Sequence, residues 1–153
     1  MRAKLPILAF AVSLVLTFQS HAQTVASIFP KGDLSAAKNH TRNIWLNELS
    51  VGDSTFESSI AVATCDAGAK LDWHMHPSGQ VLLITEGTAF YQERGKPVRI
   101  VHKGDVIKCA PGVEHWHGAA PDSGFIYIAV TPTQKGKIVW LEPVSEQAYK
   151  GLK

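Results

Sequence analysis

The sequence has little net charge, few cysteines and few long apolar runs, and each of these features excludes some classes of protein. Its 153 residues carry 15 basic and 13 acidic side chains, and the lysines and arginines form no cluster. We therefore expect no binding to nucleic acid, because such contacts need grouped positive charge. The chain also has no repeat, no low-complexity tract and no shift of composition that would mark a second domain.

One apolar run is present, near the N-terminus. It extends from Leu5 to Phe18, follows the basic residues Arg2 and Lys4, and precedes small residues at Ser20 and Ala22. These features are typical of a secretory signal peptide. The alternative is an uncleaved membrane anchor, but the run is short for a membrane span. We expect cleavage after Ala22, a secreted or periplasmic product, and no membrane contact afterwards. The remaining chain would carry 13 basic and 13 acidic residues.

The two cysteines, Cys65 and Cys109, could form a disulfide in a secreted protein. Each one, however, ends an apolar strand-like run next to a turn, and such positions are typical of small buried thiols. The sequence therefore favours two free, buried cysteines over a bridge.

Short apolar or alternating runs recur along the rest of the chain. They are NIWLNEL, STFESSIAVATC, QVLLIT, TAFYQE, VRIVH, DVIKC, FIYIAV and KIVWLE, bounded by turns that include EG, RGKP, KGD and APG. Many short strands with glycine and proline between them indicate an all-β sandwich or barrel. Only SEQAYKGL has a helical pattern, with Ser145 as its cap. We divide the chain into a signal peptide (1–22), an N-terminal arm (23–40) and one β-barrel domain (41–153).

Two histidine pairs are the strongest functional signal. His74 and His76 stand two residues apart in DWHMHPSGQ, and His115 and His117 do so in APGVEHWHGAA. Alternate residues of a strand point to the same face, so each pair can direct both imidazoles at one point. The turn PSG lets Gln80 return to that point from the next strand. One such pair also occurs on exposed strands, but two matching pairs indicate a metal site.

These residues resemble the two sequence motifs of the cupin family. The first motif is matched by Gly68, His74, His76, Gln80 and Gly87, with glutamine where glutamate is usual. The second is matched by Gly104, Gly112 and His115, with Ala110 in place of proline and Ala119 in place of asparagine. The resemblance implies a single-domain cupin, a double-stranded β-helix or jelly-roll barrel of two antiparallel sheets. It also implies one divalent metal inside the barrel, held by His74, His76, Gln80 and His115.

A narrower resemblance is to small bacterial cupins that include manganese-dependent hydroxynitrile lyases. It rests on WHMHPSGQVLLITEGTAFYQERGKP, KGDVIKCAPGVEHWHGAAPDS and GKIVWLEPVSEQAY. In that group a glutamine is the fourth metal ligand and the second histidine of H-W-H lies beside the metal as a base, a role that would fall on His117. The lyases carry a further histidine and a glutamine on the late strand, where this chain has Tyr127 and Thr131.

The remaining candidate residues surround the expected metal. Tyr127 could donate a hydrogen bond to a substrate, Thr131 lies on the same face of its strand, and Ala61 and Ala63 would leave room for a ligand. His117 could instead be a fifth ligand or a core histidine, and Tyr127 a core aromatic residue. Manganese is the metal that the resemblance favours, while nitrogen and oxygen donors also suit Fe, Ni, Co or Zn.

The sequence therefore predicts a metal-dependent enzyme that acts on a small oxygenated molecule. Neutral ligands leave the metal charge uncompensated and make it a stronger Lewis acid, while His117 would move a proton in lyase-type or isomerase-type chemistry. Two alternatives stay open: an iron- or nickel-dependent dioxygenase, and a cupin that binds a small ligand or metal without catalysis. A homodimer or higher homo-oligomer is expected, because a partner commonly covers the edges of a small barrel.

Overall fold

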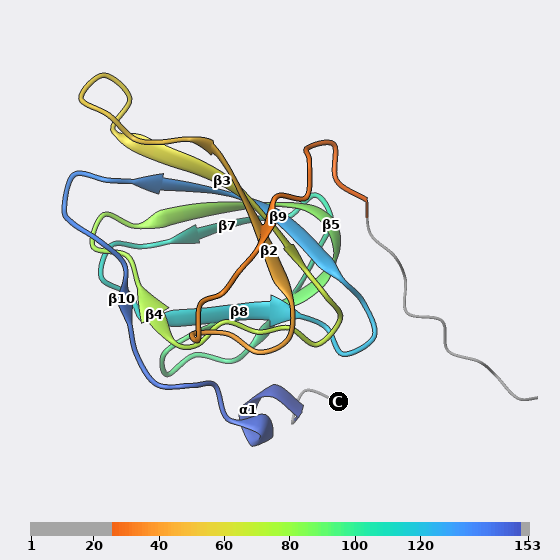
Figure 1. The fold of residues 1–153 in the computed structure, drawn as a ribbon. Helices are drawn as coiled ribbons and strands as arrows, with labels where there is room; N and C mark the ends of the chain where they lie inside the picture. The colour runs from red at the N-terminus through yellow and green to blue at the C-terminus, as the bar shows by residue number, and fades with distance from the viewer. Residues whose placement is uncertain (1–25, 151–153) are drawn as a thin grey trace, which may run out of the picture.

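The computed structural model describes residues 26–150, which form two facing layers of strands with one short helix beside them (Figure 1). The strands are β1 (Asp33–Leu34), β2 (Ile44–Ser50), β3 (Ser58–Cys65), β4 (His74–Met75), β5 (Gln80–Glu93), β6 (Arg99–His102), β7 (Val106–Cys109), β8 (His115–Ala119), β9 (Phe125–Pro132) and β10 (Val139–Trp140). The helix is α1 (Glu146–Lys150), and the Ser145 hydroxyl accepts a hydrogen bond from the Ala148 N–H at 3.1 Å. The predicted all-β fold and the capped C-terminal helix are confirmed. The expected signal peptide lies outside the described residues, within which no helix is both long and apolar enough to cross a membrane.

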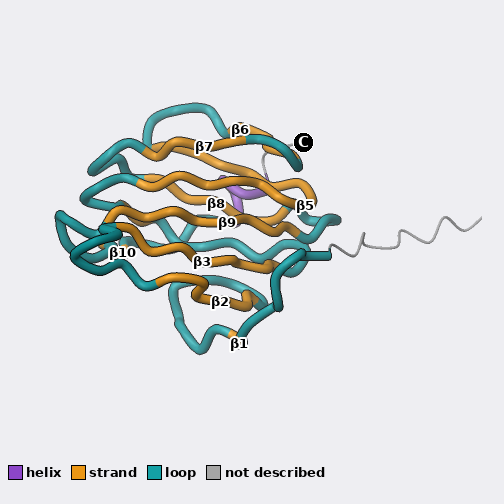
Figure 2. Tube along the Cα trace, turned by 90° about the horizontal axis from the view of Figure 1, so that it is seen from above, coloured by secondary structure: helices purple, strands orange, loops and turns teal. Residues whose placement is uncertain are grey.

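The strands pair only in antiparallel fashion within the described part of the chain. One sheet has the order β1-β2-β3-β9-β5-β7, and the other has the order β6-β5-β8-β4-β10. Figure 2 shows the strands of the first sheet side by side, with β8 behind them. The predicted architecture of two antiparallel sheets is therefore confirmed, and strand β5 belongs to both of them.

The course of β5 corrects one prediction. The sequence predicts two strands, QVLLIT and TAFYQE, separated by a turn at Glu86 and Gly87, but the structure has a single strand of 14 residues. Its register against β9 shifts between Ile84 and Glu86. At Gly87 φ is +81°, and a β-carbon there would lie 1.8 Å from the carbonyl oxygen of Gly124, so only glycine fits. This bend carries β5 from the first sheet, beside β7, into the second, beside β6 and β8.

The described part of the predicted N-terminal arm lies along the outer edge of the first sheet. Strand β1 pairs with β2, and the side-chain amide of Asn47 donates to the carbonyl oxygen of Pro30 at 3.0 Å. The Lys31 ammonium lies 3.1 Å from the centroid of the Trp45 ring. These contacts cover the β2 edge, while the domain boundary at residue 40 stays a prediction.

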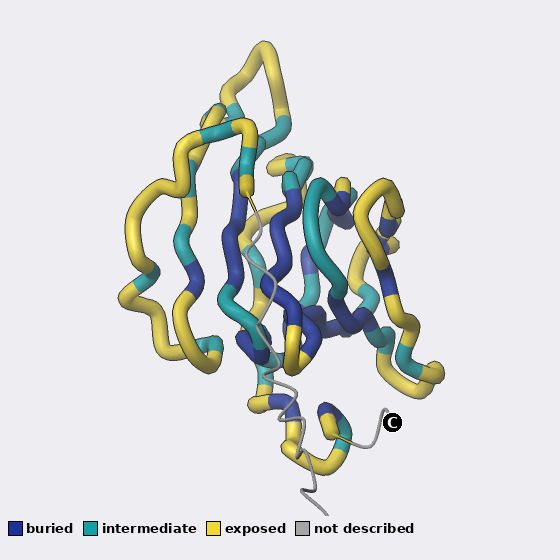
Figure 3. Tube along the Cα trace, turned by 90° about the vertical axis from the view of Figure 1, so that its right-hand side faces the viewer, coloured by how far each residue is buried: buried dark blue, intermediate teal, exposed yellow. Residues whose placement is uncertain are grey.

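Two apolar clusters hold the sheets and the helix together. The larger fills the barrel and is made of Ile44, Ala63, Cys65, Ala69, Leu82, Ile84, Ala89, Tyr91, Val101, Ile107, Cys109, Ala119, Phe125 and Tyr127. The smaller joins the second sheet to α1 and is made of Trp73, Phe90, Trp116, Ala120, Val144 and Tyr149. Figure 3 shows the buried residues running along the central strands. Both cysteines are buried and free, as predicted.

Candidate metal centre

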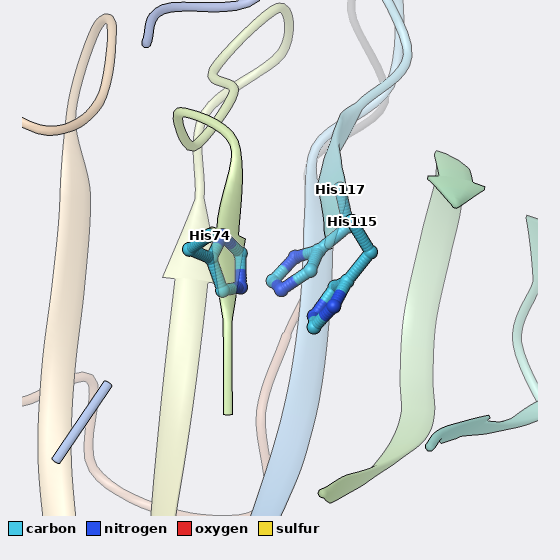
Figure 4. Close-up of side chains that lie close together, drawn as sticks. All are labelled: His74, His115 and His117. Atoms are coloured by element: carbon cyan, nitrogen blue, oxygen red, sulfur yellow. The ribbon is translucent and has the colours of Figure 1, made fainter. Parts of the chain in front are cut away.

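Four histidines meet at one end of the barrel interior. His74 begins β4 and His76 follows that strand, while His115 and His117 lie on β8, with His74 and His115 paired in register. Figure 4 shows the His74 ring directed toward the rings of His115 and His117. Ring centroids are 4.4 Å apart for His74 and His115 and 5.4 Å apart for His74 and each of the other two. One ring nitrogen each from His74, His115 and His117 lies within 4.8 Å of the others, so these three could hold a metal ion.

Two glycine turns bring these strands together. The backbone N–H groups of Gly79 and Gly112 each donate to the carbonyl oxygen of His76 at 3.0 Å. Gly79 has φ of +81°, and a β-carbon there would lie 2.9 Å from the carbonyl oxygen of Cys109. The turn that follows the first histidine pair therefore needs glycine, and it is joined at His76 to the turn that precedes the second pair.

Backbone carbonyl groups fix the orientation of two imidazoles. The Nδ1 atom of His74 is 2.8 Å from the carbonyl oxygen of Asp72, and the Nδ1 atom of His115 is 3.0 Å from that of Val113. Because a carbonyl oxygen only accepts, each Nδ1 carries the proton and each Nε2 keeps a free lone pair. The buried Nε2 of His115 has no hydrogen-bond partner within residues 26–150. A buried acceptor without a partner is costly, and metal coordination would satisfy it.

Gln80, at the start of β5, offers its amide oxygen. Its Nε2 donates to the hydroxyl of Thr131 on β9 at 3.0 Å, while its buried Oε1 has no hydrogen-bond partner in the described part of the chain. The amide oxygen is the atom of glutamine that ligates metals, and the contact between the amide nitrogen and Thr131 leaves that oxygen free. Sequence reasoning assigned Thr131 to substrate binding and missed this positioning contact, which depends on a pairing of distant strands.

Burial keeps the imidazoles of the cluster neutral. It lowers the pKa of His74 to about 3 and that of His76 to about 4, with repulsion from His115 adding to both. Burial also lowers the pKa of His115, and it lowers that of His117 well below its ordinary value, helped by repulsion from His74. Neutral imidazole is the form that binds metals. The donor types, their burial and their partnerless atoms together fit a divalent transition metal.

The other predicted site residues lie at different depths in the barrel. The Tyr127 ring lies 4.9 Å from that of His117 at an interplanar angle of 85°, and burial raises the Tyr127 pKa well above its ordinary value. Ala63 pairs with Tyr127 across β3 and β9 and is buried in the core. Ala61 pairs with Ala129 and is only partly buried. The structure thus brings Tyr127 to the histidines and places Ala61 nearer the open end than Ala63.

A pocket of ≈ 650 Å³ opens beside the histidines. It is lined by Ser59, His76, Pro77, Thr131, Pro132, Thr133, Gly136, Lys137 and Ile138. Its size suits a small molecule, and His76 and Thr131 connect it to the cluster. Sequence reasoning missed Ser59, although its position two residues before Ala61 on one strand could have revealed it. It also missed Lys137, which lies in an irregular connection where no periodicity gives a signal.

A β-barrel of two antiparallel sheets with histidines gathered inside one end defines the cupin class of protein, and the comparisons agree. A cupin domain matches residues 61–131. The (R)-mandelonitrile lyase of Granulicella tundricola is 41% identical over 91 residues, which are 59% of this chain and 70% of that protein. The chain therefore belongs to the cupin family, and the predicted resemblance is confirmed.

Solved structures place the fold in the same family. A cupin-like protein from Thermotoga maritima is 41% identical, with a TM-score of 0.77 over 82% of this chain and 96% of its own. The DMSP lyase of Ruegeria pomeroyi is 21% identical, with a TM-score of 0.57 over 67% of this chain and 54% of its own. The second likeness shows the fold alone.

Proposed function

We propose that the protein is a metal-dependent lyase that acts on a small oxygenated substrate, with the metal held by His74, His76, Gln80 and His115. The observation that carries this proposal is the pair of buried, partnerless ligand atoms, Nε2 of His115 and Oε1 of Gln80. The 41% identical mandelonitrile lyase supports lyase chemistry over the alternatives. Manganese is our first choice, and Fe, Ni, Co or Zn suit the same donors. When bound, the metal would supply Lewis-acid polarisation of a substrate oxygen.

His117 is the proposed base. Burial and the neighbouring imidazoles keep its pKa low and its ring neutral, and its Nδ1 has no hydrogen-bond partner within residues 26–150. A neutral imidazole can take a proton from a substrate hydroxyl. If the substrate is a cyanohydrin such as mandelonitrile, His117 takes the hydroxyl proton as the bond to the nitrile carbon breaks. Cyanide then recovers that proton from His117, and an aldehyde and hydrogen cyanide leave.

Tyr127 and the small residues would complete the substrate site. Because its pKa is raised by burial, the Tyr127 phenol stays protonated and can donate a hydrogen bond to a substrate oxygen. Thr131 already lines the pocket. The small side chains of Ala61 and Ala63, on β3, would leave room for the substrate. The mainly apolar lining suits a substrate with an apolar body.

Metal analysis tests the centre. Protein purified without added metal should contain close to one transition-metal ion per chain, and His115→Ala should lose it. His102→Ala is the matched control, because His102 is exposed and contacts Thr88 rather than the cluster. A wild-type protein without a near-stoichiometric transition metal would contradict the proposal.

The role of His117 needs a separate variant. His117→Ala should retain the metal and lose cleavage of mandelonitrile, measured by release of benzaldehyde. If it loses metal as completely as His115→Ala, His117 is a ligand and the base lies elsewhere. Assays with and without oxygen separate the lyase from a dioxygenase, because only the dioxygenase consumes oxygen.

We also propose a secreted or periplasmic location and a homodimer. The location is supported by the signal-like pattern of residues 1–22. The dimer is supported by apolar side chains on the outer face of the first sheet, where Leu83 and Val106 lie opposite each other and are 36% and 50% exposed. Fractionation of the producing cells and light scattering of the purified protein test these two proposals.

A further inference from the structure

A second pocket lies on the other side of β8 from the histidines. His115 and His117 point into the barrel, whereas Trp116 points outward and packs in the cluster that contains Tyr149 of α1. Figure 1 shows α1 below β8, outside the barrel. A pocket beside α1 has a volume of ≈ 630 Å³ and is lined by Thr41, Arg42, Gly68, Lys70, Phe90, Pro121, Glu146, Tyr149 and Lys150. None of these residues belongs to the histidine cluster or to the pocket that leads to it.

The lining of this pocket has more positive than negative charge. It holds three cations, Arg42, Lys70 and Lys150, and one carboxylate, Glu146. Glu146 forms ion pairs with both lysines, and the Lys70 side chain is only 5% exposed. Arg42 takes part in no ion pair within residues 26–150. Its guanidinium is therefore available for a bound anion.

The backbone holds Arg42 in an unfavourable conformation. Its φ is +56°, and it is the single non-glycine residue with positive φ in the described part of the chain. Its side chain crosses Gly68, where a β-carbon would lie 3.0 Å from Nε. The carbonyl oxygen of Arg42 accepts a hydrogen bond from Nδ1 of His40 at 3.0 Å. Side chains kept in strained backbone positions are concentrated at binding sites, and this one places a guanidinium at the pocket wall.

Aromatic rings form the apolar part of the wall. Phe90 and Tyr149 lie with ring centroids 5.6 Å apart, and the Tyr149 hydroxyl donates to the carbonyl oxygen of Ala119 at 2.6 Å. That hydrogen bond fixes the Tyr149 ring against β8. The Lys70 ammonium lies 4.8 Å from the centroid of the same ring. Fixed aromatic surface beside grouped cations suits a ligand with an anionic head and an apolar body.

We propose that this pocket binds a small organic anion whose carboxylate or phosphate group contacts Arg42 and whose apolar body lies against Phe90 and Tyr149. A volume of ≈ 630 Å³ is within the usual range for small-molecule sites. The proposal goes beyond the lyase function and does not depend on it. Strand β8 separates the ligand from the histidines, since Tyr149 bonds to Ala119 on that strand while His115 and His117 face the barrel.

Calorimetric titration of the full chain with benzoate, phenyl phosphate and inorganic phosphate tests the site. We expect benzoate or phenyl phosphate to bind, with the tighter of the two identifying the preferred head group. Arg42→Asn should weaken that binding by about tenfold or more, because the guanidinium is lost while asparagine tolerates positive φ. The thermal midpoint of this variant should be unchanged or higher, which separates lost binding from lost folding.

Lys137→Gln is the matched control, since it removes a cation from the pocket beside the histidines and should leave the affinity unchanged. Three results would each overturn the proposal. The first is no binding of any probe up to about 10 mM. The second is equal affinity of wild type and Arg42→Asn, or a loss with Lys137→Gln instead. The third is equal affinity for phenyl phosphate and inorganic phosphate, because the aromatic wall would then contribute nothing.

Discussion

The two ends of the barrel interior are built from the same strands and have opposite chemistry. Along each strand, the inward positions change from polar at the histidine end to apolar at the other. In order from the histidine end, the inward residues are Gln80, Leu82 and Ile84 on β5; His115, His117 and Ala119 on β8; and Thr131, Ala129, Tyr127 and Phe125 on β9. The boundary lies where the rings of His117 and Tyr127 meet, 4.9 Å apart.

Because of this difference, the apolar end of the core mainly serves stability and the polar end mainly serves function. The apolar end removes large side chains from water and supplies the main driving force for folding. At the polar end, buried atoms without partners in the described chain, such as Oε1 of Gln80, each cost about 1–3 kcal/mol. A bound metal would offset that cost, because any ligand that binds only the folded state stabilises it.

The largest expected effect comes from damage to the apolar end. Phe125 is fully buried, and its ring stacks on Tyr127 with centroids 4.8 Å apart. Phe125→Ala should lower the free energy of unfolding by about 3–5 kcal/mol, because it removes buried apolar contacts and leaves a cavity. Denaturant unfolding measures this loss. Phe56→Ala, at a side chain that is 71% exposed, is the control and should have little effect. A loss below about 1 kcal/mol for Phe125→Ala would contradict the division proposed for the core.

The second prediction concerns pH and the polar end. In metal-free protein, the folded-state pKa values of His74 and His76 are about 3 and about 4, against an ordinary value of 6.5. Above pH 6.5 the folded and the unfolded chain bind the same number of protons at these sites. Below it the unfolded chain binds protons that the folded chain does not. Stability should therefore fall as pH drops from 6.5 toward about 5, approaching about 1.4 kcal/mol per pH unit for each histidine.

Denaturant unfolding at several pH values, after removal of metal with a chelator, measures this slope. His76→Gln should reduce the slope, because it removes one of the four histidines whose pKa burial lowers. His102→Gln changes an exposed histidine outside the cluster and should keep the wild-type slope. Stability that stays constant between pH 6.5 and about 5 would show that the histidines are not buried as neutral groups.

Local patterns explain why most of the fold and the histidine cluster could be predicted from the sequence. Alternation at a period of two identifies the strands, and two H-x-H pairs identify a shared face, since both signals lie within a few residues. The course of β5 could not be read in this way. Glycine adopts positive φ in both turns and bulges, so its presence at Gly87 does not distinguish them. The close approach of the Gly124 carbonyl oxygen, which is distant in the sequence, makes this position a bend within one strand.

Contacts between distant segments explain the other omissions. Lys137 lines the pocket beside the histidines only because the connection after β9 folds back along it. Arg42 and Tyr149 meet at the second pocket although they are distant in the sequence, and neither belongs to the two histidine motifs. Residue types and periodicity do not predict such contacts between distant residues, because these contacts depend on how the whole chain packs.

The smallest predicted effect lies at the contact between Gln80 and Thr131. Thr131→Val keeps the shape of the side chain but removes the acceptor for Nε2 of Gln80, which lies 3.0 Å from the Thr131 hydroxyl. Unfolding free energy should fall by only about 0.5–1.5 kcal/mol. Metal affinity should fall as well, because the amide then loses the contact that holds it in place. Thr133→Val, in the same pocket, is the control and should leave metal affinity unchanged. Unchanged metal affinity in Thr131→Val, measured by competition with a chelator, would mean that Gln80 is held in place without Thr131 or is not a ligand.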